Sequence, residues 1–337
     1  MRLGILGGGS WGTALGILWA KKGHPVQLWV RNPENAKKFQ ENRCNTKYLP
    51  DTPFPENLEA TNDLEGVIEN SQLICLAVPL QAYRSFLRSI ADQLADYHQI
   101  VILSKGIELE THQLPTQIVL DVLGTEWRNR TYTLSGPSFA KEVAELKPTT
   151  VVLAGNNTDR LTTLQKALNC PSFRMYRNRD VTGVELCAAL KNVIAIASGM
   201  SQGLNLGHNT IAGLITRGLA EISRLAVALG GKQETCAGLA GMGDLILTCT
   251  GSLSRNLRVG QALARGENLQ TALDNLGMVA EGVQTCRSAN QLGKQLGVDL
   301  PITNVINRIL YEGLSPKDAL EALMSRSLKS EHQSEKF

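Results

Sequence analysis

Short apolar runs recur through about the first 155 residues, and polar or helical stretches separate them. Continuous runs of this length are typical of strands buried in a parallel sheet. The runs that predict strands are 3–6, 26–30, 73–79, 99–103, 131–134 and 149–154, of which 149–154 is predicted to be the last. The polar interval 35–70 contains a proline-rich segment, 49–55, which we expect to be a surface loop. The alternation predicts an α/β domain with a mostly parallel, doubly wound sheet.

From about Val181 the apolar positions follow helical spacing, which predicts an all-α C-terminal domain. The segment 183–200 is apolar nearly all round, as expected of a helix at the centre of a domain. Further helices are predicted over 209–229 and 257–263, and a final helical pair begins at Pro301. The predicted division is 1–180 for the first domain, 181–325 for the second, and 326–337 for a polar tail that we expect to be disordered.

Composition narrows the class of protein. A chain of 337 residues exceeds the usual size of one hydrophobic core, which favours two domains. A net charge of +3 is too small to indicate nucleic-acid binding, so we expect small-molecule partners, with a homodimer as the one protein assembly to consider. The opening apolar run is too short for a signal peptide, and no later run predicts a membrane span, so we expect a cytoplasmic protein without integral membrane contact.

The cysteines and histidines predict neither disulfides nor a metal site. The seven cysteines are an odd number and are widely scattered, which favours reduced thiols. The five histidines are dispersed as well, so we expect no metal ligand cluster.

A glycine motif follows the first predicted strand directly and precedes a helical segment. Gly7 permits a tight turn, Gly9 lets the backbone approach a pyrophosphate, and Gly12 lets helix and strand pack closely. The helix N-terminus then faces the bound anion. The alternative is an ordinary glycine-rich turn, but the run 26–30 follows at βαβ distance, so we predict a Rossmann-type domain that binds a dinucleotide.

Arg31 follows the second predicted strand, where NAD-selective Rossmann units usually carry an acidic residue for the ribose hydroxyls. A guanidinium there suits the 2′-phosphate of NADP(H) instead. The alternative is a solvated arginine at a strand end.

Two further strands end in residues that would face a cofactor, because ligands of such sheets lie beyond the carboxyl ends of the strands. Lys105 follows the run 99–103, where a positive charge would serve an anionic or carbonyl substrate. The alternative is a solvated lysine. The run 131–134 leads into a small-residue turn, 135–140, that permits close approach of the backbone.

In the helical domain, Lys191 lies at the centre of the apolar segment 183–200. Lysine is almost never fully buried without a partner. Its side chain therefore either extends to the surface or faces a polar cleft, and we favour the cleft.

The small-residue segments 238–245 and 248–256 interrupt the helical pattern and end in Ser-Arg-Asn before a helix. This arrangement predicts an anion site at a helix N-terminus, with the Arg255 guanidinium as a bidentate partner for phosphate. The alternative is a structural capping loop.

With these residues in view, the chain resembles the bacterial glycerol-3-phosphate dehydrogenase [NAD(P)+] family from the first strand to about residue 325. The motifs that carry the resemblance are those at 7–14, 104–106, 135–142, 191–196, 215–221, 243–245, 254–256 and 279–282. Two features depart from the family: Met242 stands where leucine is common, and the C-terminal tail has no family pattern.

The resemblance implies reversible reduction of dihydroxyacetone phosphate to sn-glycerol 3-phosphate, which feeds glycerophospholipid synthesis, with NADP(H) and/or NAD(H) as cofactor. It implies that Lys191 is the proton acceptor in the oxidation direction and that Lys105 assists it. The residues expected at the dinucleotide are Gly7, Gly9, Ser10, Trp11, Gly12, Arg31, Lys105, Ala140, Arg255, Val279 and Glu281. Those expected at the substrate are Lys105, Gly136, Ser138, Lys191, Asn192, Asp244, Thr248, Ser254, Arg255 and Asn256.

The chemistry agrees with these roles. A free lysine is protonated at neutral pH, but a neighbouring cation and a dry cleft favour its neutral form, so Lys191 beside Lys105 is suited to act as a base. Asp244 would counter this positive field.

Two alternatives remain on the sequence alone. Dehydrogenases of the 3-hydroxyacid or 6-phosphogluconate type also use a lysine on a helix of the second domain, but they lack the 254–256 loop after the Gly-Asp pair at 243–244. A non-catalytic NADPH-binding regulator could keep the same fold, although the retained chemical positions argue against it.

Overall fold

One eight-stranded sheet forms the first half of the chain in the computed structural model, which describes residues 1–328, 330 and 331. The strand order is β10-β9-β8-β7-β6-β1-β2-β5, and all neighbours are parallel except the antiparallel pair β8 and β9. The strands are β1 (Leu3–Leu6), β2 (Val26–Trp29), β5 (Leu58–Thr61), β6 (Leu73–Leu76), β7 (Gln99–Ile102), β8 (Thr131–Ser135), β9 (Thr149–Gly155) and β10 (Phe173–Asn178). The predicted mostly parallel sheet is confirmed.

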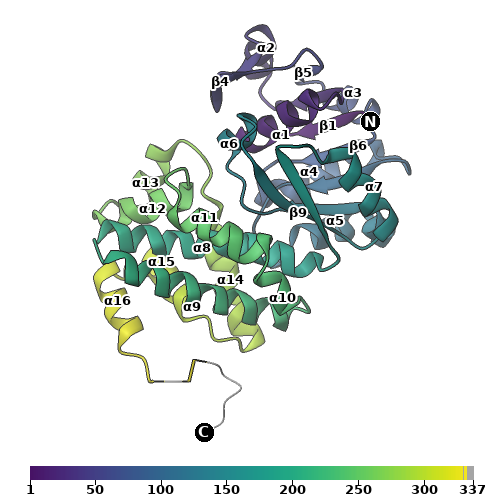
Figure 1. Ribbon diagram of the computed structural model, residues 1–337. Helices are drawn as coiled ribbons and strands as arrows, with labels where there is room; N and C mark the ends of the chain where they lie inside the picture. The colour runs from purple at the N-terminus through teal and green to yellow at the C-terminus, as the bar shows by residue number, and fades with distance from the viewer. Residues whose placement is uncertain (329, 332–337) are drawn as a thin grey trace.

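Helices cover both faces of this sheet, as Figure 1 shows at its upper right. They are α1 (Ser10–Lys21), α2 (Pro33–Glu41), α3 (Leu64–Glu69), α4 (Tyr83–Ile90), α5 (Pro115–Leu123), α6 (Ala140–Ala144) and α7 (Thr158–Leu168). One apolar core lies under α1, α2, α6 and α7, and a second lies under α3, α4 and α5. β2, the next strand of this sheet in the chain, lies on one side of β1, and the later strand β6 lies on the other side. The strand order therefore reverses at β1, and sheets of this kind bind ligands at the carboxyl end of the strands at such a switch point.

The structure of this domain differs from the predictions at two places. The segment 49–55 is not simply a loop, because β4 (Leu49–Pro53) pairs with β3 (Cys44–Asn45) in a small separate hairpin. Prolines are tolerated in β4 because it pairs along one edge only. The run 149–154 is also not the last strand, since β10 pairs with β9 after α7, although exposed polar residues alternate along β10 and weaken its apolar signal.

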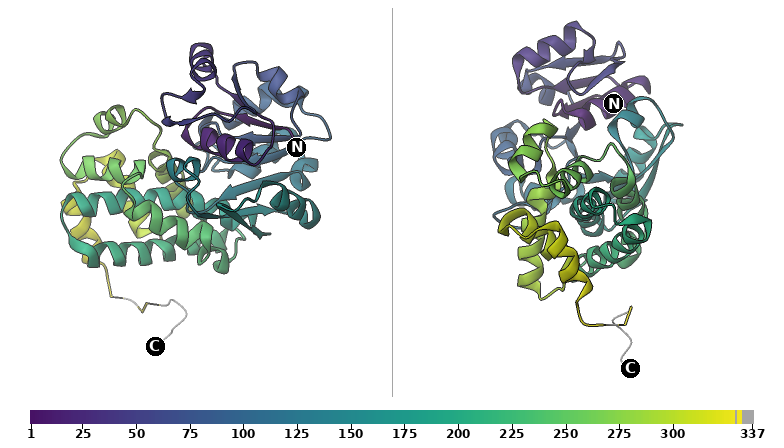
Figure 2. Two further views of the ribbon diagram at one scale, coloured as in Figure 1. Left: turned by 45° about the horizontal axis from the view of Figure 1, so that its top comes forward. Right: turned by 90° about the vertical axis from the view of Figure 1, so that its left-hand side faces the viewer.

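The second half of the chain is helical around one central helix, α8 (Val181–Gly203). Figure 2 shows the helices packed on it from two further sides. They are α9 (Gly207–Ala228), α10 (Gln233–Cys236), α11 (Asp244–Thr250), α12 (Arg255–Ala264), α13 (Leu269–Leu276), α14 (Glu281–Leu296), α15 (Pro301–Glu312) and α16 (Pro316–Met324). By length and composition α8 could cross a membrane, but 94% of its most apolar stretch is buried inside the protein. This helix is apolar on all sides because other helices surround it at the centre of the domain.

The tail predicted to be disordered, 326–337, lies mostly outside the described residues. Within the described part, the Arg326 guanidinium pairs with the Asp299 carboxylate at 2.9 Å, which ties the start of the tail to the loop before α15.

Helices α8 and α12 cross with their backbones in contact, and two glycines permit it. A Cβ on Gly199 would lie 2.0 Å from the Leu257 carbonyl oxygen, and a Cβ on Gly260 would lie 2.0 Å from that of Ile196. Any side chain here would push α12 away from α8. The N-terminus of α12 carries the predicted phosphate-binding residues, so this contact fixes where they lie.

We expect Gly260→Ala to lower the free energy of unfolding by about 1–3 kcal/mol, because the added methyl overpacks the crossing. Gly213→Ala is the matched control: Gly213 is exposed in the middle of α9, and a Cβ there would have no atom of the described chain within 4 Å. Alanine should stabilise that helix by about 0.5–1 kcal/mol. Urea unfolding of both variants measures the difference, and equal effects would contradict the close crossing.

Candidate active site

A buried carboxylate joins the two domains at the predicted catalytic residues. One oxygen of Asp244 accepts a hydrogen bond from Lys191 Nζ at 2.5 Å, and the other accepts one from Lys105 Nζ at 2.9 Å. Lys191 Nζ also donates to Thr248 Oγ1 at 2.9 Å. Lys105 follows β7 in the sheet domain, whereas the other three residues belong to the helical domain. The cluster thus lies at the carboxyl edge of the sheet, where a substrate would meet a cofactor.

The charged groups in this cluster change one another's pKa values. The pKa of Lys191 is lowered to about 7: burial is the main cause and the nearby Lys105 charge adds to it, while Asp244 opposes both. Burial alone would raise the pKa of Asp244, but the two ammonium groups outweigh it and hold that pKa below its ordinary value. Lys191 is 6% exposed, so it faces the polar interior and does not extend to the surface. A lysine in this state can exchange a proton near neutral pH.

A tight helical turn places Asp244 opposite the two lysines. The start of the segment expected to interrupt the helical pattern is a π-helical turn, Leu239–Gly243, that runs directly into α11. A Cβ on Gly241 would lie 2.0 Å from the Cys236 carbonyl oxygen, so glycine permits this compact turn. The expected interruption of the helical pattern over 238–245 and 248–256 is therefore wrong for most of these residues: glycines lowered the helical signal, but here they serve close packing.

Two amide side chains connect α8, α12 and α14 beside the cluster. Asn256 Nδ2 donates to Asn192 Oδ1 at 2.9 Å, and Asn256 Oδ1 accepts from the Gly282 backbone N–H at 3.0 Å. Ser254 Oγ accepts a hydrogen bond from the Leu257 N–H at the N-terminus of α12, so it caps that helix. The capping alternative is thus realised for Ser254, and the predicted substrate residues Asn192 and Asn256 lie in one buried network.

Arg255 Nη1 donates to the Val279 carbonyl oxygen at 2.7 Å, which brings together two of the residues expected at the dinucleotide. Burial raises the pKa of the neighbouring Glu281, although Arg255, Lys105 and Lys191 all oppose this shift. Lys105, Val279 and Glu281 line one narrow cleft between the domains.

The glycine turn has the geometry of a dinucleotide site. Gly7 has a φ of +135°, and a Cβ on Gly12 would lie 2.2 Å from the Gly7 carbonyl oxygen, so both positions need glycine. Beside Gly9 a Cβ would have no atom of the described residues within 4 Å, which leaves this side of the turn open. Among those residues, nothing accepts a hydrogen bond from the buried indole N–H of Trp11. An open turn and an unpaired donor fit a bound pyrophosphate or ribose.

The remaining predicted residues lie around this turn and at the next strand ends. Ser10 begins α1, and Ala140 begins α6. Gly136 has a φ of +132° after β8, and Ser138 Oγ donates to its carbonyl oxygen at 2.9 Å. Arg31 follows β2, is exposed, and makes no hydrogen bond within the described part of the chain.

Sequence reasoning missed Glu185, a buried carboxyl on α8. The signal that singled out Lys191, a charged residue in an apolar helix, applies equally to Glu185 and could have found it.

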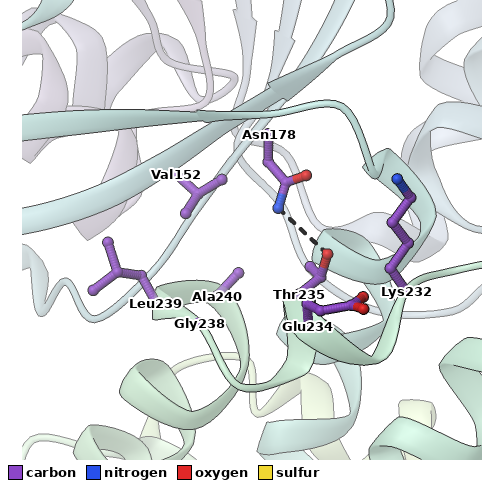
Figure 3. A pocket seen from close by; sticks show the side chains of 8 residues that line it. All are labelled: Val152, Asn178, Lys232, Glu234, Thr235, Gly238, Leu239 and Ala240. Carbon is purple, nitrogen blue, oxygen red and sulfur yellow. Dashed lines mark hydrogen bonds between the residues drawn. The ribbon is translucent and has the colours of Figure 1, made fainter.

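A separate hollow of about 230 Å³ lies at the domain junction between β9, the end of β10, α10 and the π-helical turn (Figure 3). Val152 and Leu239 form its apolar side, and Asn178 Nδ2 reaches Thr235 Oγ1 across it at 3.4 Å. None of its lining residues is among the individual residues expected at the cofactor or the substrate. The chemical cluster around Asp244 is therefore the candidate active site.

A doubly wound sheet with a dinucleotide turn, facing a buried lysine and carboxylate on an all-α domain, defines a two-domain nicotinamide-dependent dehydrogenase. The chain belongs to the NAD-dependent glycerol-3-phosphate dehydrogenase family. The N-terminal part of the family matches residues 2–161, and the C-terminal part matches residues 180–321. The family expected from the sequence motifs is confirmed.

Named relatives match along nearly the whole chain. The glycerol-3-phosphate dehydrogenase [NAD(P)+] of Geobacter metallireducens is 47% identical over 330 residues, covering 98% of this chain and 98% of the relative. That of Geobacillus thermodenitrificans is 45% identical and covers 97% and 95%. The crystal structure of glycerol-3-phosphate dehydrogenase from Coxiella burnetii superposes with a TM-score of 0.92 at 40% identity, covering 96% of this chain and 99% of the other.

We expect Asp244→Asn to destabilise the fold by roughly 3–5 kcal/mol, because it removes the buried counter-charge of Lys105 and of the protonated form of Lys191. The loss should grow as the pH falls below about 7. There the parent takes up a proton on Lys191, whose pKa is about 7, whereas the variant, with a lower Lys191 pKa, does not.

Urea unfolding of parent and variant at about pH 6 and pH 9 measures this dependence. The difference should increase by about 1.4 kcal/mol for each pH unit below 7 until Lys191 of the variant is also protonated. Asp92→Asn, at an exposed carboxylate, should change stability little at either pH. A loss that is the same at both pH values would contradict the coupling.

Proposed function

We propose that the chain catalyses the reversible, NAD(P)H-dependent reduction of dihydroxyacetone phosphate to sn-glycerol 3-phosphate, a step that feeds glycerophospholipid synthesis. The observation that carries this proposal is the buried cluster of Lys105, Lys191 and Asp244 at the sheet edge, in a chain of this family. The reaction adds a hydride to a carbonyl carbon and a proton to its oxygen, so it needs a proton donor fixed beside a cofactor.

The glycine turn and α1 would hold the dinucleotide. The open space beside Gly9 would admit the pyrophosphate, and the unpaired Trp11 N–H would donate to the cofactor. When bound, the nicotinamide ring supplies or accepts the hydride at its C4 atom. Arg31, which is exposed after β2 and has no partner among the described residues, would pair with a 2′-phosphate.

Lys191 would exchange the proton. In reduction, its ammonium donates a proton to the carbonyl oxygen as negative charge develops there, and in oxidation the neutral amine removes the proton from the hydroxyl. Lys105 would bind the same oxygen and favour the neutral form of Lys191 by repulsion. Asp244 and Thr248 hold the Lys191 amine in place.

The N-terminus of α12 would bind the substrate phosphate. Arg255 still has guanidinium N–H groups beyond the one bonded to Val279, and these suit phosphate oxygens. Ser254 and Asn256 flank it in the chain, and Gly136 and Ser138, after β8, would bind the substrate from the sheet domain.

Three broader proposals accompany this function. The domain boundary between residues 180 and 181 is supported by β10, which ends at Asn178, and by α8, which begins at Val181. Action in the cytoplasm is supported by the odd number and scattered positions of the cysteines. Assembly as a homodimer is the third, and sedimentation of the purified protein tests it.

Turnover of dihydroxyacetone phosphate with NADPH or NADH, followed by absorbance, tests the function directly. We expect Lys191→Ala to lower the rate per folded protein by about 10²–10⁴ while cofactor binding stays close to that of the parent. Lys191→Arg should not restore activity, because a guanidinium stays protonated. In the parent, oxidation of glycerol 3-phosphate should increase as the pH rises through about 7, where Lys191 loses its proton. Near-parental activity of Lys191→Ala with that pH profile intact would move the proton-transfer role to Lys105.

We expect Arg255→Ala to weaken binding of dihydroxyacetone phosphate by roughly 1.5–3 kcal/mol, because charge-assisted bonds to the phosphate are lost. Arg258→Ala is the matched control, since Arg258 is an exposed arginine one turn further along α12. It should leave KM unchanged. Equal KM values for the two variants would refute the role of Arg255.

We expect Arg31→Asp to raise KM for NADPH by about tenfold or more, because a carboxylate repels the 2′-phosphate where a guanidinium attracted it. KM for NADH should change little. If both cofactors keep their parental KM values, Arg31 is a solvated side chain.

A further inference from the structure

We infer that Glu185 is a positioning residue for the dehydrogenase reaction: its carboxylate sets the sheet domain in register with the helix that carries Lys191. The inference rests on the proposed function, because it takes the turn after β8 as part of the substrate site and Lys191 on α8 as the proton-transfer group.

The Glu185 carboxylate receives hydrogen bonds from two elements of the sheet domain. Its Oε1 accepts from Thr116 Oγ1 at 2.6 Å and from Thr133 Oγ1 at 2.7 Å. The backbone N–H of Thr116 donates to both carboxylate oxygens, at 3.1 Å and 3.3 Å. All three residues are buried, with exposed fractions of 3%, 7% and 2% for Glu185, Thr116 and Thr133. One side chain of α8 is thereby fixed to the first turn of α5 and to β8.

The joined elements are those that carry the chemistry. β8 leads from Thr133 directly into the turn at Gly136 and Ser138, and α8 leads from Glu185 to Lys191 and Asn192. A shift of α8 along β8 would move the proton-transfer group relative to the substrate turn. Misplacement of reacting groups by about 1 Å can cost about 10²-fold in rate.

The ionised form of Glu185 is disfavoured by burial, and no described lysine or arginine forms an ion pair with it. Burial raises its pKa to about 7, and the hydrogen bonds from Thr116 and Thr133 only partly oppose this. A carboxylate, which accepts hydrogen bonds at both oxygens, orients three donors from two elements at once. An apolar side chain would pack here at lower cost but would fix no register.

Other contacts hold the two domains together without Glu185. Lys105 pairs with Asp244, and Ser288 Oγ on α14 donates to the backbone carbonyl oxygens of Ile107 and Glu108 at 3.2 Å. Ile107 and Leu114, which precede α5, are part of the apolar core of the helical domain. Loss of Glu185 should therefore leave the domains associated but out of register.

The chain contains a matched control in Glu221. This carboxylate is also buried, and burial raises its pKa to about 7. It accepts hydrogen bonds from the backbone N–H groups of Ile302 and Thr303, at 2.5 Å and 3.1 Å, and from Thr303 Oγ1 at 3.1 Å. These contacts join α9 to α15, so they lie wholly within the helical domain. Glu185 and Glu221 thus share their chemistry and differ in what they connect.

The experiment compares Glu185→Ala and Glu185→Gln with Glu221→Ala and Glu221→Gln in the full chain. Each variant is measured for melting temperature, for Kd of NADPH by fluorescence, and for kcat and KM with dihydroxyacetone phosphate. Rates are normalised to the fraction of folded protein. The isotope effect on kcat is measured with NADPH deuterated at the transferred hydrogen, because misalignment slows hydride transfer itself.

Both alanine variants should melt at lower temperature. Only Glu185→Ala should lose kcat, by about 10-fold to 10²-fold, with a larger isotope effect and an unchanged Kd for NADPH. Glu185→Gln should recover most of the rate, because its amide oxygen still accepts from the Thr116 N–H and the threonine hydroxyls can rotate toward the amide group. If Glu185→Ala does not fold, Thr133→Val, which removes one hydrogen bond at similar volume, should show the same changes in kcat and isotope effect at reduced size.

The inference is overturned if the kcat and isotope effect of Glu185→Ala, or of Thr133→Val where the alanine variant does not fold, match those of Glu221→Ala. In that case Glu185 only stabilises the fold. A parent that does not turn over dihydroxyacetone phosphate with either cofactor would instead refute the proposed function, and this inference with it.

Discussion

The structure depends on one buried carboxylate that holds two ammonium groups from different domains. Asp244 can stay ionised in the interior only because Lys105 and Lys191 are both close, and Lys191 can hold a proton there near neutral pH only because Asp244 is ionised. Neither domain supplies the whole cluster. The charge balance therefore requires the edge of the sheet, α8 and α11 to meet with side-chain atoms within about 3 Å of one another.

Much of the surrounding architecture serves this requirement. The compact turn before α11 brings Asp244 to α8, and the glycine crossing of α8 with α12 carries Ser254 and Arg255 to the same place. Carboxylates also fix the helices around it by accepting hydrogen bonds from backbone N–H groups. Asp180, for example, caps α8 at Gly183 and receives the Lys232 N–H from the segment before α10. Such bonds orient helix ends more strictly than apolar contacts do.

Features that depend on local sequence could be predicted. The buried parallel strands, the glycine turn at 7–12 and the long helix around Lys191 all have short-range signals, and their positions in the structure differ from the predictions by a few residues at most. The partners of Lys191 were harder to predict, because Asp244 and Thr248 are distant in sequence and lie in a segment whose glycines indicated a loop. The family motifs named these residues, but periodicity alone could not.

The failures have a common physical cause. β10 and β4 carry alternating or proline-containing sequences that are stable only when paired with a neighbouring strand, so tertiary pairing decided their structure. Glu185 itself carries a sequence signal, a charged residue in an apolar helix, but its partners could not be predicted, because its donors come from α5 and β8 and neither threonine carries a signal of its own. Long-range polar contacts of this kind become visible only once the chain has folded.

The crossing of α8 and α12 also bears on which molecules the site accepts. Glycine contacts prevent α12 from moving closer, and the amide pair of Asn192 and Asn256 prevents it from rolling. The backbone at Arg255 is therefore held at a set distance from the backbone at Lys191. If Arg255 binds the substrate phosphate and Lys191 exchanges the proton, as proposed, this fixed spacing would exclude a phosphate ester with one more carbon between its carbonyl and its phosphate. Selectivity for a three-carbon skeleton would then come from backbone packing as much as from the side chains that touch the substrate.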